Sequence, residues 1–95
     1  MIVFPVTITN YDAPGVKGVT IIGEVFSTFA NAWAYSMRLA MFNVNNGSSR
    51  LFDEPSTFDY NENTGMIEVY NSNHELLEEI WVWKNKVETN SYFRD

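Results

Sequence analysis

The chain has 95 residues, a size typical of one domain, and 45% of them are hydrophobic, which is too many for a disordered chain. Its formal net charge of −6 therefore has to lie on a folded surface. Cysteine is absent, which excludes disulfides and thiolate-held zinc, and no apolar run approaches the roughly 20 residues of a membrane span. We predict a single α+β domain over residues 1–95 that is used inside a cell.

Residues 1–26 predict an N-terminal β-hairpin. Its first strand, residues 2–9, alternates apolar and polar side chains and so places four apolar residues on one face: Ile2, Phe4, Val6 and Ile8. Pro5 has no backbone donor, so this strand should lie at a sheet edge or leave that position unpaired. Turn-forming residues fill 10–15, and the β-branched run 18–26 should pair antiparallel with the first strand.

The next segment, residues 28–43, predicts a helix with Ser27 or Thr28 as its N-cap. The apolar spacing changes here to nearly four and forms a stripe: Phe26, Phe29/Ala30, Trp33, Met37, Ala40/Met41 and Val44. Three further apolar residues lie away from this stripe, so either the hairpin or a second copy of the chain should cover them: Tyr35, Leu39 and Phe42. The Asn- and Gly-rich residues 45–49 should end the helix.

Residues 57–84 predict a three-stranded meander, with strands near 58–60, 66–70 and 76–84. The order β-β-α-β-β-β most simply gives one antiparallel sheet with a single helix packed on one face. On the last two strands we assign the β-branched residues to the helix side: Ile67, Val69, Ile80 and Val82. The alternate positions mix carboxylates with aromatics, which are costly to bury together, and belong to the other face: Met66, Glu68, Tyr70, Glu79, Trp81 and Trp83. The reverse assignment, with both tryptophans in the core, stays open. The tail 85–95 should fray or add a short turn.

Charge is unevenly distributed along the chain. Between Leu51 and Trp83 there are no lysines or arginines and eight acids: Asp53, Glu54, Asp59, Glu62, Glu68, Glu75, Glu78 and Glu79. One interpretation is a solvated surface that aids solubility. The other is a surface that meets a basic protein or nucleoprotein complex. Either way the stretch would repel nucleic acid and anionic membranes, so direct binding of both is disfavoured.

The expected partner-binding surface combines these acids with the aromatic residues of the last two strands. Cross-strand aromatics often only stabilise a sheet, but exposed tryptophan and tyrosine beside acids have the composition of a binding hot spot. The candidate partner-binding residues are Asp53, Glu54, Asp59, Glu62, Glu68, Tyr70, Glu78, Glu79, Trp81 and Trp83.

Other chemistry finds little support in the sequence. The segment 59–65 carries oxygen side chains at alternate positions, as a calcium loop does, but its glycine comes one place late and Tyr70 replaces the final bidentate Glu. His74 is the sole histidine, and Glu78 and Glu79 should point to opposite faces of a strand. We therefore expect no enzyme, no metal site and no cofactor, with a calcium-binding module as a remaining alternative.

In its small size, acidity and lack of cysteine, together with the acid-only stretch from Asp53 to Glu79, the chain resembles the proteins that bacteriophages and other mobile elements encode against host defence, anti-CRISPR inhibitors among them. This resemblance implies a non-catalytic inhibitor in the host cytoplasm, whose carboxylates stand where phosphates would lie in a basic nucleic-acid channel. The alternative is a structural subunit of a homo-oligomer or virion-type assembly, for instance a homodimer through helix 28–43.

Overall fold

The computed structural model describes residues 1–87, so the predicted domain end and the tail from residue 88 onward lie outside the described residues. The elements are β1 (Ile2–Ala13), β2 (Val16–Phe26), α1 (Phe29–Asn46), β3 (Pro55–Asn61), β4 (Met66–Asn71), β5 (Leu76–Val82) and β6 (Asn85–Lys86). The predicted order β-β-α-β-β-β is confirmed, with the short β6 as an addition. Each predicted strand of the hairpin extends farther than the alternation indicated.

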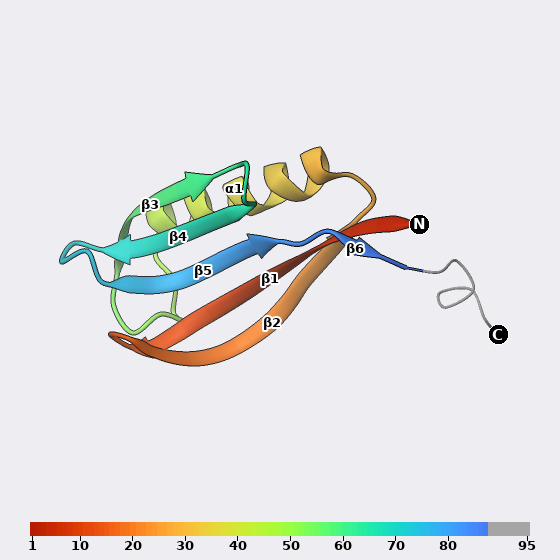
Figure 1. Ribbon diagram of the computed structural model, residues 1–95. Coiled ribbons are helices and arrows are strands. Elements are labelled where there is room, and N and C mark those ends of the chain that lie inside the picture. Colours follow the sequence, from red (N-terminus) through yellow and green to blue (C-terminus); the bar gives the residue numbers. More distant parts are fainter. Residues whose placement is uncertain (88–95) are drawn as a thin grey trace.

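All strands join one antiparallel sheet in the order β2-β1-β5-β4-β3, and β6 pairs with the start of β1 (Figure 1). The prediction that Pro5 places β1 at an edge is wrong, because β1 is central. The other predicted possibility, that the strand leaves the position of Pro5 unpaired, explains the proline. The Pro5 carbonyl accepts a hydrogen bond from Trp83 N, so its missing donor points to the same side, where the pairing of β1 passes from β5 to β6.

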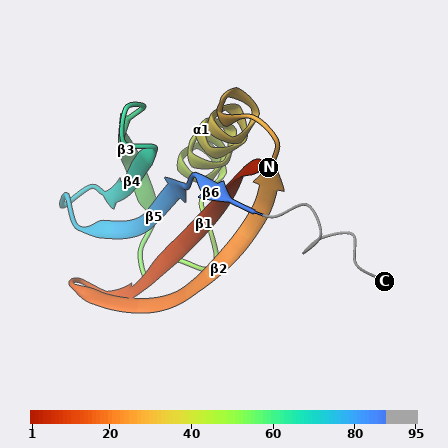
Figure 2. The ribbon, with the colours of Figure 1, turned by 45° about the vertical axis from the view of Figure 1, so that its right-hand side comes forward.

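The helix α1 covers one face of the sheet, and the core lies between them (Figure 2). The assignment of the β-branched residues of β4 and β5 to this face is confirmed, since Ile67, Val69 and Ile80 are fully buried in the helix-side core and Val82 nearly so. This packing settles the open question in favour of the tryptophans lying on the other face.

The predicted apolar stripe of α1 is rotated from the face that is buried. The fully or nearly buried residues of the helix are Ala32, Ser36, Ala40 and Asn43, while Trp33 and Met37 flank this line. Small side chains let the helix backbone come close to the sheet, so the large residues pack at its sides rather than beneath it. On the other flank, Tyr35 packs on Phe26 of β2, whereas Phe42 remains 61% exposed.

The ends of α1 follow local rules. Thr28 is the N-cap, and its side-chain oxygen accepts a hydrogen bond of 3.2 Å from Asn31 N. Gly47 ends the helix with a φ of 70°, a conformation that glycine adopts without strain.

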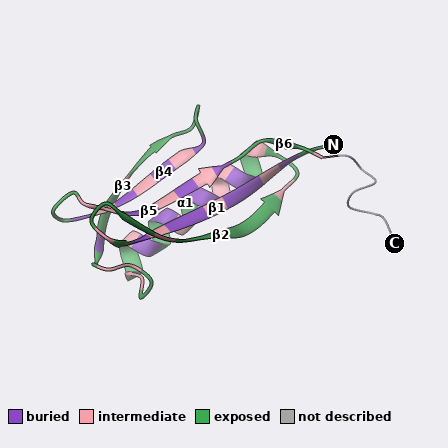
Figure 3. Cartoon of the chain, turned by 60° about the horizontal axis from the view of Figure 1, so that its bottom comes forward, coloured by how far each residue is buried: buried purple, intermediate pink, exposed green. Residues whose placement is uncertain are grey.

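Burial differs sharply between neighbouring strands (Figure 3). Strand β1 is buried on both faces over much of its length, since Thr9 and Tyr11, on the side away from the helix, are each 8% exposed. Strand β2 has no buried residue. Within residues 1–87, no helix has both the length and the apolar character that crossing a bilayer requires.

Candidate functional site

The candidate surface is the sheet face away from α1, which we call the outer face. Strand pairing places the carboxylates of Asp59, Glu68 and Glu79 directly opposite one another on β3, β4 and β5. Neighbouring strands lie about 4.8 Å apart, so the three acids form a straight row across the sheet, the carboxylate row. The row continues through Thr9 to Thr20, whose hydroxyl oxygens lie 2.7 Å apart.

The carboxylate row is not evenly solvated. Asp59 is exposed at the edge strand, whereas Glu68 and Glu79 are partly buried. The side chain of Tyr11, 8% exposed, lies over the end of the row and donates a hydrogen bond of 2.5 Å to Glu79 Oε1. This hydrogen bond, burial and the charges of Glu79 and Glu68 raise the pKa of Tyr11 to about 12.

Aromatic side chains border the row on both sides. Trp81 and Trp83 stack with ring centroids 5.7 Å apart, and Trp83, 47% exposed, donates its indole N–H to Thr7 Oγ1 at 2.7 Å. On β4, Tyr70 stacks on His74 at 4.2 Å. Burial and the carboxylates of Glu68 and Asp59 raise the pKa of Tyr70. The outer face thus presents a line of negative charge between two aromatic pairs.

Six of the ten predicted residues come together on this face: Asp59, Glu68, Tyr70, Glu79, Trp81 and Trp83. Glu78 does not belong to it, and its place in the predicted surface is wrong. Successive residues of a strand point to opposite faces, so Glu78 enters the helix side, where it is 2% exposed and accepts a 2.8 Å hydrogen bond from Asn43 Nδ2.

The remaining predicted acids lie off the carboxylate row. Asp53 precedes β3 and accepts a hydrogen bond of 3.0 Å from Asn71 Nδ2. Glu54 is exposed just before β3, and Glu62 is exposed in the turn between β3 and β4. They add to the negative field of this half of the molecule without lining the row.

Tyr11 and Thr7 are the outer-face residues that sequence reasoning missed. Tyr11 was missed because residues 10–15 contain turn formers and predict an end of the first strand at residue 9, although the strand continues to Ala13. Thr7 lies within the predicted strand but was not singled out. Continued alternation from Thr7 through Thr9 to Tyr11 was the signal that could have found them.

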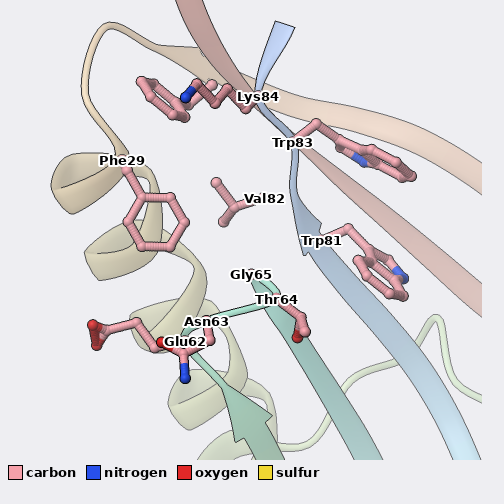
Figure 4. Close-up of a pocket in the computed structure, with 10 residues that line it drawn as sticks. Phe29, Glu62, Asn63, Thr64, Gly65, Trp81, Val82, Trp83 and Lys84 are labelled. Carbon is pink, nitrogen blue, oxygen red and sulfur yellow. The ribbon is translucent and has the colours of Figure 1, made fainter.

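A cleft of about 660 Å³ opens at the end of the sheet, between the β3–β4 turn and the start of α1. Phe29, Val82, Trp81 and Trp83 are among the residues that line it, and the indole rings of Trp81 and Trp83 extend to the opposite side of the strand from Phe29 and Val82 (Figure 4). Glu62 and Lys84 lie at the rim.

Among the described residues, no three His, Cys, Asp or Glu side chains gather closely enough to hold a metal ion, the segment 59–65 included. The residues of segment 59–65 instead form the end of β3 and a turn, in which Gly65 N donates a hydrogen bond of 2.9 Å to Asn61 O. No protein-family model, curated protein or solved structure gives a significant match to this chain.

Proposed function

We propose that this protein is a non-catalytic inhibitor that uses its outer face to occupy a basic, nucleic-acid-binding site of a host defence complex. The observation that carries the proposal is the carboxylate row of Asp59, Glu68 and Glu79. Like charges directly opposite on neighbouring strands destabilise a sheet, so three in line represent a cost to folding that a solubilising surface does not require.

The surroundings of the row support recognition of a protein. Trp81, Trp83 and Tyr70 supply rigid contact area beside the charges, and such residues provide much of the binding energy at protein interfaces. Hydrogen bonds already fix two of the groups, since Glu79 accepts from Tyr11 and Trp83 donates to Thr7. A surface ordered before binding loses little conformational entropy when a partner docks.

Negative charges fixed at strand spacing can engage the lysine and arginine side chains that otherwise contact phosphates. No lysine or arginine lies between Leu51 and Trp83 to neutralise the row from within this part of the chain. Occupation of such a channel would exclude nucleic acid by competition, without chemistry.

The test compares two doubly substituted variants with the same change in charge. Glu68→Lys/Glu79→Lys reverses the row, whereas Glu54→Lys/Glu62→Lys reverses two exposed acids outside it. Each protein is immobilised and challenged with a heparin-binding fraction of bacterial proteins, in the presence and absence of a single-stranded DNA competitor.

We expect wild type and the Glu54/Glu62 variant to retain a basic protein that the DNA displaces, with retention falling at higher salt. The row variant should bind about tenfold more weakly or worse. Equal loss in both variants would mean only a general charge effect and would refute the proposal, as would retention that DNA does not displace.

A further inference from the structure

Strand β2 is the most exposed apolar segment of the described chain. None of its 11 residues is buried, and Figure 3 shows it as exposed along nearly its whole length. Five of its large aliphatic residues are exposed, from 38% at Ile21 to 68% at Ile22; the others are Val16, Val19 and Val25. An apolar run of this length on one strand exceeds the scattered exposure of an ordinary surface.

The strand also has unpaired backbone groups. It lies at one end of the sheet and pairs only with β1, so the other side presents free donors and acceptors. The opposite edge strand, β3, begins with Pro55, which has no backbone donor for a further strand. Strand β2 contains no proline and exposes five large aliphatic residues, so it is the better suited of the two edges to accept a further strand, although its own pairing with β1 has three irregularities.

We propose that two copies of this chain pair antiparallel through β2 and join their six-stranded sheets into one. The proposal is independent of the function proposed for the outer face. Pairing of β2 with β2 gives a closed dimer with a twofold axis. Pairing of β2 with β3 of another copy would instead add copies without limit, and it would place β2 beside Pro55 and Asp59.

Charge favours a second copy as the occupant. Strand β2 contains one lysine, Lys17, near its start and one glutamate, Glu24, near its end, so it is neutral on a chain with a net charge of −6. Antiparallel pairing places the positively charged end of each strand beside the negatively charged end of the other. Parallel pairing would place ends of the same charge side by side. Lys17 and Glu24 lie on opposite faces of the sheet, opposite Tyr11 and Val6 of β1, so the attraction acts between strand ends rather than as one ion pair.

The symmetry also predicts the register. In an antiparallel pair around a twofold axis perpendicular to the sheet, the residue at the axis faces its own copy, and Ile21 is the midpoint of β2. Centring the pair on Ile21 uses the whole strand and brings Ile22 near Thr20 of the second copy. Both of these residues lie on the outer face, so Ile22 would lose most of its exposure there.

Mass measurement by light scattering tests the proposal with charge-matched variants. Val19→Lys/Ile22→Lys places two lysines on β2, and Met41→Lys/Phe42→Lys places two on the exposed apolar part of α1. We expect wild type and the α1 variant to have twice the 11.0 kDa mass of the chain, and the β2 variant to have that of one chain. A monomeric wild type at high concentration, or dissociation of the α1 variant alone, would overturn the proposal.

A cross-link tests the register without disturbing the fold by charge. Because the chain has no cysteine, a single Ile21→Cys substitution can form a disulfide only between copies. Oxidation should convert Ile21→Cys to a covalent dimer, whereas Ser49→Cys, exposed after α1, should remain a single chain. Equal cross-linking at both positions, or none at Ile21→Cys, would contradict pairing through β2.

Discussion

The phenol of Tyr11 donates a hydrogen bond of 2.5 Å to the carboxylate of Glu79, joining residues 68 positions apart in the chain. It connects the N-terminal hairpin to the carboxylate row and sets where one of the three acids points. The bond therefore contributes both to the stability of the fold and to the order of the outer face.

Tyr11→Phe removes the donor and leaves the rest of the side chain in place. We expect a loss of about 1.5–3 kcal/mol in the free energy of unfolding at neutral pH, the range for a hydrogen bond to a charged group. Chemical denaturation of the two proteins measures the difference. An unchanged midpoint would show that water replaces the phenol without cost.

The same residue predicts a pH dependence. Its pKa in the fold is raised from 10.0 to about 12, so the contribution of Tyr11 to stability is fully present below pH 10 and is lost as the pH rises towards 12. Wild type should lose stability over this interval more steeply than Tyr11→Phe. The pKa of Tyr70 is raised as well, so ultraviolet titration should show one late-ionising tyrosine fewer in Tyr11→Phe than in wild type.

Glu78 predicts a second dependence of stability on pH, this time in the acidic range. Burial raises its pKa above the usual 4.5, although the hydrogen bond from Asn43 and the charge of Arg50 act against this. Its contribution to stability is therefore full below the usual pKa and is lost as the pH rises through the raised value in the fold. Glu78→Gln keeps an acceptor for Asn43 and removes the charge, so it should be more stable than wild type at neutral pH and lose that advantage in acid.

Denaturation at several pH values checks this prediction, with Glu62→Gln at an exposed position as the control. The control should follow wild type at every pH. A Glu78→Gln protein that is less stable at neutral pH would show that the carboxylate is held charged by a partner.

Gly65 and Gly15 offer a matched pair of substitutions, since their φ angles are 74° and 73°. An added Cβ at Gly65 would lie 2.6 Å from the carbonyl oxygen of Val82, whereas at Gly15 it would meet nothing within 4 Å. Alanine at Gly15 should cost about 1–2 kcal/mol from the backbone alone. Alanine at Gly65 should cost roughly 2 kcal/mol more, because the β5 backbone has to move. Equal costs in urea denaturation would show that this contact relaxes freely.

Fluorescence can separate the tryptophans. Trp83 is 47% exposed, and Trp33 and Trp81 are each partly buried. Trp83→Phe should remove most of the emission that acrylamide quenches, and Thr7→Val, which removes the acceptor of its indole N–H, should make Trp83 easier to quench. Quenching that survives in Trp83→Phe and disappears in Trp81→Phe would contradict this assignment.

Local patterns predicted the elements well because their causes are local. The change from alternation to a spacing near four marks the passage from β2 to α1, and Thr28 caps the helix as a threonine at that place should. The faces of β4 and β5 also followed from alternation, which is why the row of Glu68 and Glu79 could be expected.

What the sequence did not reveal depends on distant partners. The central place of β1 arises from pairing with β5, which no local signal at Pro5 indicates. Asn71 lies just beyond the strand predicted near 66–70, yet it is 2% exposed and its side chain donates to both Asp53 and Glu75. The buried line of α1 consists of small residues, because close approach to the sheet outweighed the preference for burying large apolar side chains.

The position of β1 also determines when the protein can fold during synthesis. The hairpin of β1 and β2 leaves the ribosome early, but the second neighbour of β1 exists only after β5, at Leu76–Val82, has been made. Until then the edge of β1 that pairs with β5 has no partner strand, and the apolar side of α1 has no complete sheet to pack against. The pairing of Ile8 with Ile80 is therefore available only late in synthesis, and a nascent chain that stops before β5 would expose both edges of the β1–β2 hairpin to other molecules.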